Sequence, residues 1–392
     1  MDTGTGVIVI GGHVQGLGLI RSLAKEGISV YLIDDTYLCI ARFSKYCKKF
    51  FYFRNMNDGE AFVRYLLIFA NKERIKNWML LPTTDREVAT LSKSRALLKE
   101  QYLVPVPEWN VIEKAYNKQS TYRIADEMGI SIPKTLYPAD EQDVQNFSSE
   151  LTFPVIIKPA VMHSFYKKTN RKVIVVRNKE ELLRKYIKLC QIVEPSELMI
   201  QEIIPGSPEE LYSFCSFFKN GEVIARCMGR RARQIPMDFG KASTFVESVN
   251  IPELETLSVK LLKSMDYYGL SEVEFKRDIR DGKFKLLEIN PRSWKWHTLA
   301  LRAGINLPHL LFKDMHSGVA GNKIYRAKEG IKWIDLYTDI FVVSKEILTG
   351  RMKFQQYINS LRGEKEFAVA SWDDPLPFVA ETMLISYLAA TR

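Results

Sequence analysis

The sequence predicts an α/β protein of more than one domain, and three observations lead to that prediction. Residues 7–34 indicate an apolar strand, a glycine-rich turn, a helix and a second strand. The alternation of strand and helix patterns continues through residues 46–82. At 392 residues the chain is longer than one ordinary hydrophobic core accommodates, so it should divide into two or three domains.

The composition is that of a globular protein, with 46% hydrophobic and 26% charged residues. Its five cysteines lack CxxC spacing, which predicts buried thiols in a reducing compartment. We see neither a signal peptide nor a long apolar run, so we expect a cytoplasmic protein without a membrane span. The net charge of +10 comes from basic residues spread along the chain, and we assign it to nucleotide and acidic substrates rather than to nucleic acid.

The first βαβ unit, residues 7–34, predicts a Rossmann-like opening domain. Its turn departs from the dinucleotide fingerprint, because His13 stands where the second glycine should approach a pyrophosphate. A nicotinamide or flavin enzyme is therefore disfavoured. His13 and Gln15 are placed to touch a substrate, although a tight turn with a solvated histidine explains them equally well.

Polar residues follow the strand pattern at residues 78–82. Thr83, Thr84 and Asp85 stand at the carboxyl end of this expected parallel strand, where ligands gather in open α/β sheets. The simpler explanation is that Thr84 or Asp85 caps the next helix, and we favour it. Asp85 remains a secondary site candidate.

Residues 269–292 predict two antiparallel strands joined by an Asp-Gly turn. Because alternate residues of a strand share a face, Glu288 and Asn290 project the same way, and a suitable register brings Glu274 beside them. Two carboxylates and an amide are hard oxygen ligands that suit Mg2+ beside phosphates and water. The alternative is an ordinary hairpin with acidic residues on its wet face.

Glu274 together with the LEINPR segment at residues 287–292 resembles the metal-binding end of the ATP-grasp ligases. The resemblance implies that Glu274, Glu288 and Asn290 hold the Mg2+ ions, with Mn2+ as a substitute, that bridge the phosphates of ATP. It also implies that Arg292 stabilises charge on the transferred phosphoryl group or on an acyl intermediate.

Two lysines match the nucleotide-binding half of the same family. Lys118 precedes a short helix and a GISIPKT segment, and the resemblance implies that it contacts the ATP phosphates. Lys158 ends the apolar strand pattern at residues 153–159, where a buried ammonium must find an anion or reach solvent. By the resemblance it binds phosphate.

The QEIIPG segment that begins at residue 201 resembles the adenine-binding strand of the family. The resemblance implies that Glu202 accepts from the adenine amino group and that the backbone of Ile203 and Ile204 pairs with the ring edge. Glu209 or Glu210 is expected to hold the ribose hydroxyls, and the match does not choose between them. For Glu202 the alternative is a solvated residue at a strand end.

Many family members have a glycine-rich loop that closes over the phosphates, whereas the loop expected at residues 160–172 of this chain contains no glycine. Backbone cradling of phosphates is therefore in doubt, and His163, Ser164 or the neighbouring lysines would have to cover them. In this respect the chain resembles the carboxylate-amine ligase branch that includes the D-aspartate ligases.

A loop rich in arginine is expected at residues 229–243. Planar guanidinium groups bind carboxylates or phosphates through two hydrogen bonds. Arg231 and Arg233 are thus candidate catalytic anchors for the carboxylate to be activated. A merely solvated basic loop is an equal alternative.

Taken together, the matches extend over residues 1–310 and predict three parts. These are a Rossmann-like pre-ATP-grasp domain (1–113), an ATP-grasp domain of two α+β subdomains (114–320) and a helical C-terminal extension (321–392).

The activity that the resemblance implies is ATP-dependent ligation of a small-molecule carboxylate to an amine through an acyl phosphate, with ADP and phosphate released. A homodimer would match many relatives. One alternative is a bicarbonate-activating enzyme of the carbamoyl-phosphate type, although the chain shows no second ATP-binding half and no biotin attachment motif. A second alternative is a non-catalytic nucleotide-binding protein on the same fold. Such a protein would not need the two metal ions and the arginine that the resemblance assigns to Glu274, Glu288, Asn290 and Arg292.

Overall fold

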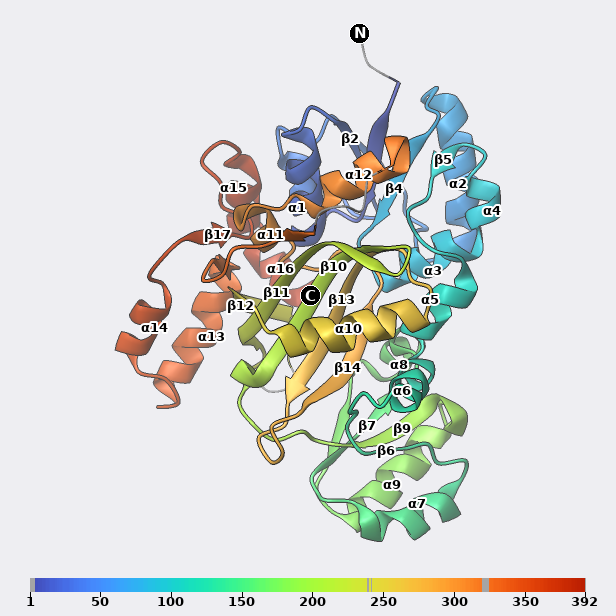
Figure 1. Ribbon diagram of the computed structural model, residues 1–392, viewed down its shortest axis with the longest axis vertical. Coiled ribbons are helices and arrows are strands. Elements are labelled where there is room, and N and C mark those ends of the chain that lie inside the picture. The colour runs from blue at the N-terminus through green and yellow to red at the C-terminus, as the bar shows by residue number, and fades with distance from the viewer. Residues whose placement is uncertain (1–3, 238–239, 241, 319–323, 392) are drawn as a thin grey trace.

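The computed structural model describes residues 4–237, 240, 242–318 and 324–391, and it leaves out the side chains of Met162, His163, Ser164, Lys167 and 389–391. The described backbone forms three sheets (Figure 1). The N-terminal sheet lies at one end of the molecule, the smallest sheet lies at the opposite end, and the largest sheet lies between them.

The N-terminal sheet is parallel, as the βαβ opening predicts, with the strand order β3-β2-β1-β4-β5. Its strands are β1 (Gly6–Ile10), β2 (Ser29–Asp34), β3 (Lys49–Tyr52), β4 (Trp78–Pro82) and β5 (Tyr102–Leu103). The accompanying helices are α1 (Val14–Ala24), α2 (Gly59–Lys72), α3 (Asp85–Lys93) and α4 (Arg95–Leu98). Every residue of β1 and β4 is buried, because helices cover both faces of a parallel sheet. Gly11 has a φ of +99°, and a Cβ there would lie 2.1 Å from the Thr83 hydroxyl, so the turn into α1 requires glycine.

The smallest sheet is antiparallel and has the order β6-β9-β7-β8. Its strands are β6 (Thr135–Leu136), β7 (Val155–Pro159), β8 (Ile174–Val176) and β9 (Leu198–Glu202). Helices α5 (Trp109–Tyr116) and α6 (Lys118–Glu127) lead into it, and α7 (Glu141–Phe147) and α9 (Lys179–Cys190) lie against it (Figure 1). Between β7 and β8, where a loop was expected, the chain forms helix α8 (Met162–Thr169).

The largest sheet has the order β14-β13-β10-β11-β12-β16-β17, with β15 paired to β11. The strands are β10 (Leu211–Lys219), β11 (Glu222–Ile235), β12 (Ala242–Val249), β13 (Gly269–Arg277), β14 (Phe284–Asn290), β15 (Tyr325–Arg326), β16 (Lys332–Ile334) and β17 (Lys365–Phe367). Helix α10 (Pro252–Ser264) packs on one face, where Val273 and Phe275 enter the core with Leu261 and Leu262. By strand alternation, the opposite face carries Glu272 and Glu274.

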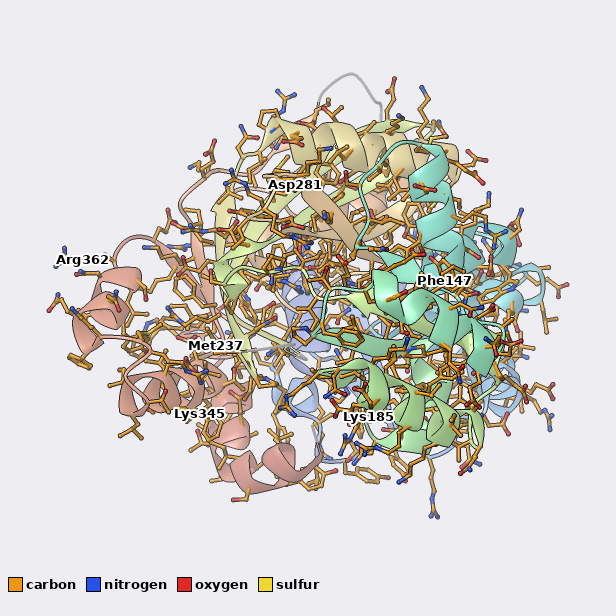
Figure 2. All side chains as sticks on the ribbon, turned by 90° about the horizontal axis from the view of Figure 1, so that it is seen from below. Phe147, Lys185, Met237, Asp281, Lys345 and Arg362 are labelled. Carbon is orange, nitrogen blue, oxygen red and sulfur yellow. The ribbon has the colours of Figure 1, made fainter. Side chains whose placement is uncertain are left out.

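The residues that follow β14 combine helices with short strands. The helices are α11 (Thr298–Arg302), α12 (Leu307–Ser317), α13 (Leu336–Leu348), α14 (Phe354–Ser360), α15 (Leu376–Met383) and α16 (Ile385–Thr391). Strands β15, β16 and β17 were not expected, since two or three residues are too few to show a strand period. Lys345 and Arg362 mark this segment on the side of the molecule away from Phe147 and Lys185 (Figure 2). Within the described ranges, no helix combines the length and apolarity needed to cross a membrane.

The C-terminal segment is also tied to the first helix. Arg21 of α1, which is buried, donates from Nε to Asp374 at 2.9 Å and from its terminal nitrogens to the carbonyls of Val369 and Asp374. Asp374 also accepts from the Ser44 hydroxyl at 2.6 Å and from the Lys45 amide at 3.0 Å. A buried guanidinium is tolerated only when it is paired in this way, so residues 369–374 are part of the N-terminal packing.

Candidate active site

Strands β13 and β14 place three carboxylates and an amide on one face of the largest sheet. In their antiparallel register Glu274 lies opposite Glu288, and Glu272 lies opposite Asn290. Glu272, Glu274 and Asn290 are all less than one-tenth exposed. The structure thus brings together the three predicted metal ligands and adds Glu272 to them.

Asn290 links this cluster to the N-terminal domain. Its Nδ2 donates to Glu274 at 2.9 Å and to Glu272 at 3.1 Å, while its Oδ1 accepts from Arg292 at 3.1 Å. Arg292 in turn donates from Nε to Asp85 at 2.7 Å. Asp85 of the N-terminal α/β part therefore forms an ion pair with Arg292, the predicted catalytic arginine.

Two neighbouring residues at the start of α3 have different roles, one in capping the helix and one in pairing with Arg292. Thr84 forms a capping box with Glu87, as the expected helix cap, and leaves Asp85 free to pair with Arg292. At the start of α1, the amide of Gln15 donates to the carbonyl of Ser293 at 2.7 Å, so it supports the residue next to Arg292.

The two predicted phosphate-binding lysines reach the cluster from α6 and β7. Lys118 donates to Glu288 at 2.5 Å, and Lys158 donates to the Tyr122 hydroxyl at 2.7 Å. Tyr122 donates onward to the carbonyl of Leu287 at 2.7 Å, which ties Lys158 to β14. Because both lysines are buried or nearly so, an anion placed between them would meet positive charge that water does not screen.

Burial and the neighbouring charges shift the pKa values of these groups. Burial, together with the nearby Lys118 ammonium, lowers the pKa of Lys158 to about 7. The Lys118 ammonium holds the pKa of Glu288 well below its usual range. Burial raises the pKa of Glu274, and it raises that of Glu272 to about 8 with help from the Glu274 charge.

Arg231 and Arg233, which were expected in a loop, lie instead on β11, and their side chains have different partners. The Arg231 guanidinium is 2.6 Å from Glu274, whereas Arg233 donates to both oxygens of Asp339 at 2.7 Å. The register with β12 shifts between Arg230 and Arg233, and such a bulge re-aims neighbouring side chains. Arg231 belongs to the cluster. The expectation that Arg233 anchors a substrate is corrected, because its guanidinium joins β11 to α13.

Asp339→Asn is expected to lower the free energy of unfolding by about 3 kcal/mol, because it breaks a buried ion pair. The side chains of Arg233 and Asp339 are 4% and 0% exposed, so the guanidinium would remain buried without a counter-charge. Denaturant unfolding measures the change. Lys345→Gln on the exposed side of the same helix is the control, and equal stabilities of the two variants would contradict the structural role.

The expected adenine-binding residues stand where β9 ends. The side chain of Glu202 is 11% exposed and lies 3.6 Å from the Arg280 guanidinium. Ile203 is partly buried and Ile204 is buried. The Ile204 carbonyl accepts from Lys276 at 2.8 Å, so part of the backbone expected to face the ring already has a partner in the protein.

The two candidates for the ribose hydroxyls differ in burial. Glu209 is exposed, whereas Glu210 is partly buried against Gly206. Within the described chain, Oε2 of Glu210 is buried and has no hydrogen-bond partner. An acceptor in that state is open to a hydroxyl donor, so the geometry favours Glu210.

Sequence reasoning missed two charged members of the cluster. Glu272 precedes Glu274 by two residues on the same strand face, and that spacing was the signal. Lys172 lies just before β8, where burial lowers its pKa and the charges of Glu288 and Glu274 oppose that effect. The side chains of His163 and Ser164, which were expected to cover the phosphates, lie outside the described ones.

The donor set suits a metal ion that also binds phosphate. Among the described residues, no three His, Cys, Asp or Glu side chains are arranged around one metal position. Mg2+ needs only one or two protein carboxylates when phosphates and water complete its shell, and Glu274 and Glu288 face one another. Arg231 and Lys118 now neutralise these carboxylates, so a bound cation would replace them. Asn290 would have to turn its oxygen toward such a cation.

No protein-family profile matches the chain. A curated relative, the D-aspartate ligase of Enterococcus faecium (strain Aus0004), is 24% identical over 266 residues, which is 65% of this chain and 63% of that ligase. The match therefore spans just under two thirds of the length of that relative.

Solved structures align with most of the chain. The N5-carboxyaminoimidazole synthetase of Staphylococcus aureus, complexed with ADP, aligns with a TM-score of 0.66 at 16% identity and covers 89% of this chain and 87% of its own. The biotin carboxylase domain of Hydrogenobacter thermophilus 2-oxoglutarate carboxylase, a dimer with MgADP and bicarbonate, aligns with a TM-score of 0.64 at 16% identity, covering 81% and 71%.

Proposed function

We propose, from the premise that this chain has the ATP-grasp fold of these ligases, that it is an ATP-dependent ligase joining a carboxylate to an amine. The fold itself agrees with the relatives compared above. The observation that carries the proposal is the convergence of acids, amide and cations from three segments of the chain: Lys118, Lys158, Glu274, Glu288, Asn290 and Arg292.

The reaction we propose begins with transfer of the γ-phosphoryl group of ATP to a substrate carboxylate. An ionised carboxylate is a poor electrophile, and the acyl phosphate gives it a leaving group that an amine displaces as phosphate. Lys118, Lys158 and Arg292 would stabilise the charge that moves during transfer, and Arg231 would hold the substrate carboxylate. Mg2+ bound at Glu274 and Glu288 would offset the charge of the phosphates.

The nucleotide would lie between the smallest and the largest sheet. We assign the adenine to Glu202 with the backbone of Ile203 and Ile204, and the ribose to Glu210. This order continues from Glu202 along the strands toward Glu274 and Arg292, since Arg280 at the turn of the β13–β14 hairpin lies beside Glu202.

The test is Mg2+-dependent release of ADP and phosphate from ATP. D-aspartate, other amino acids and dicarboxylic acids are supplied singly and then in pairs. Release that requires a carboxylate and an amine together would support the ligase. Release with bicarbonate and no amine would support the bicarbonate-activating alternative, and ATP binding without turnover on any pair would favour a nucleotide-binding protein.

Glu202→Ala is expected to weaken ATP binding by about 10-fold, because it removes one hydrogen bond to the base. Calorimetric titration with a non-hydrolysable ATP analogue measures the dissociation constant. Glu222→Ala, at an exposed end of β11, is the control. An unchanged dissociation constant for Glu202→Ala would refute the adenine assignment.

We further propose that the chain has three parts, residues 1–113, 114–320 and 321–392, and that the protein is a cytoplasmic homodimer. Sedimentation analysis of the purified protein would test the homodimer.

A further inference from the structure

The β9–β10 linker, residues 203–210, contains a buried residue whose two backbone groups differ in their partners. Ile204 is 5% exposed. Its carbonyl accepts from the Lys276 ammonium at 2.8 Å, whereas its amide donates to no group in the described part of the chain. Folded proteins pair nearly all buried amides, and an exception at a candidate nucleotide site indicates a donor that a ligand completes.

Lys276 reaches the linker from the strand that carries the acidic cluster. It follows Glu274 by two residues on the same face of β13, and its side chain extends to the end of β9. The ammonium donates to the carbonyl of Gly206 at 3.0 Å as well as to that of Ile204. These two hydrogen bonds from one side chain fix the direction of both carbonyls.

The β13–β14 hairpin also holds the linker beyond Lys276. Gly206 has a φ of +106°, and a Cβ there would lie 3.1 Å from Cγ2 of Ile279, so the linker packs closely on the hairpin. The Arg280 guanidinium lies 3.6 Å from Glu202, which is too far for a hydrogen bond. The Glu202 carboxylate therefore keeps its capacity to accept, close in the chain to the open amide of Ile204.

The open acceptor and the open donor suit the edge of one purine. Adenine presents an amino group at position 6, which donates, and a ring nitrogen at position 1, which accepts. Glu202 would accept from the amino group, and the Ile204 amide would donate to the ring nitrogen. Guanine presents a carbonyl at position 6 and an N–H at position 1. It would bring an acceptor to the carboxylate and a donor to the amide.

The bond from Lys276 removes the group that guanine would need. The N–H at position 1 of guanine requires an acceptor, and the carbonyl of Ile204 would be one beside the Ile204 amide. Because the Lys276 ammonium occupies this carbonyl, guanine would leave its donor unpaired on binding. A site that leaves a buried polar group unpaired rejects the ligand strongly.

We propose that Lys276 sets the preference of the nucleotide site for adenine over guanine, by keeping the Ile204 carbonyl from the base and leaving the Ile204 amide to face it. The proposal rests on the adenine position proposed above and on no step of the ligase reaction. Lys276 is a positioning residue, because it acts on the base through the backbone of the β9–β10 linker.

Titration calorimetry with ADP and GDP in the presence of Mg2+ tests this role without turnover. The wild type is expected to prefer ADP, and Lys276→Met should lower the ratio of the two dissociation constants by about 10-fold or more. Lys276→Arg, which keeps two donors, should retain the preference. Lys283→Met, at an exposed lysine of the same hairpin, is the control. An unchanged ratio, including an equal loss of affinity for both nucleotides, would show a merely structural role and overturn the proposal.

A second test uses the wild-type protein alone. The diphosphate of purine riboside lacks the amino group of adenine but keeps the accepting nitrogen at position 1, whereas inosine diphosphate carries an N–H there. The purine riboside nucleotide is expected to bind about 10-fold tighter than inosine diphosphate. Equal or tighter binding of inosine diphosphate would overturn the proposal, because the linker would then offer the base an acceptor.

These tests separate the proposal from the adenine position and from the ligase function. Weaker ATP binding in Glu202→Ala, with a base preference that is insensitive to Lys276, would keep the adenine position and refute the role of Lys276. A preference that depends on Lys276 in a protein that turns over no pair of substrates would refute the ligase and keep that role.

Discussion

Glu288→Gln is expected to reduce Mg2+-dependent ATP turnover by about 1,000-fold or more while leaving the protein folded. Glu288 faces Glu274 and accepts from Lys118, which keeps the Glu288 carboxylate ionised across the working pH range. Glutamine preserves the shape and still accepts a hydrogen bond from Lys118. It removes the negative charge that a divalent cation requires, so the loss should fall on catalysis.

Release of ADP measures the turnover of this variant, and circular dichroism reports its folding. Asp281→Asn is the matched control, because Asp281 lies in the turn between β13 and β14 rather than on either strand. Retained turnover with normal metal dependence in Glu288→Gln would refute the assignment of Glu288 as a metal ligand.

Lys158→Met is expected to weaken ATP binding on the order of 100-fold and to remove a pH dependence that the wild type shows. Because burial lowers the pKa of Lys158 to about 7, its ammonium is charged below that pH and largely neutral above it in the free protein. Above pH 7, Lys158 must therefore take up a proton from the solvent when ATP binds. The wild-type affinity should fall as pH rises through 7, by up to about tenfold per pH unit.

Titrations with an ATP analogue between about pH 6 and pH 9 measure this dependence, with buffers of different ionisation enthalpy to count the protons taken up. Lys168→Met, an exposed lysine of α8, is the control and should follow the wild type. A wild-type affinity that is flat over this range, or a Lys158→Met profile parallel to it, would contradict the phosphate-binding role.

Strand periodicity was enough to predict which face of the β13–β14 hairpin carries the acids. Glu288 and Asn290 are two residues apart, so their shared face follows from any strand assignment. Their pairing with Glu274 and Glu272 depends on register, including the irregularity after Glu274, and the sequence alone leaves that register open.

The divergence of Arg231 and Arg233 could not be predicted from their spacing. Two residues apart on a regular strand they would face the same side, and in a loop neither direction would be specified. The bulge against β12 decides the outcome, and it depends on tertiary pairing rather than on the local sequence.

The segment after Lys158 differs from the expected loop for another reason. The absence of glycine from residues 160–172 indicates the loss of a phosphate-cradling loop. The same absence permits a helix, because glycine is the residue that most weakens helix interiors after proline, and the structure forms α8 there.

The ion pair between Arg21 and Asp374 affects folding during synthesis on the ribosome. The two residues are 353 positions apart. Because chains grow at about 5 to 20 residues per second, Asp374 is synthesised roughly 20 to 70 s after Arg21. Until then the guanidinium must stay hydrated, which keeps α1 from its final packing. The packing of the strands that are synthesised first is therefore completed only after residue 374 has emerged.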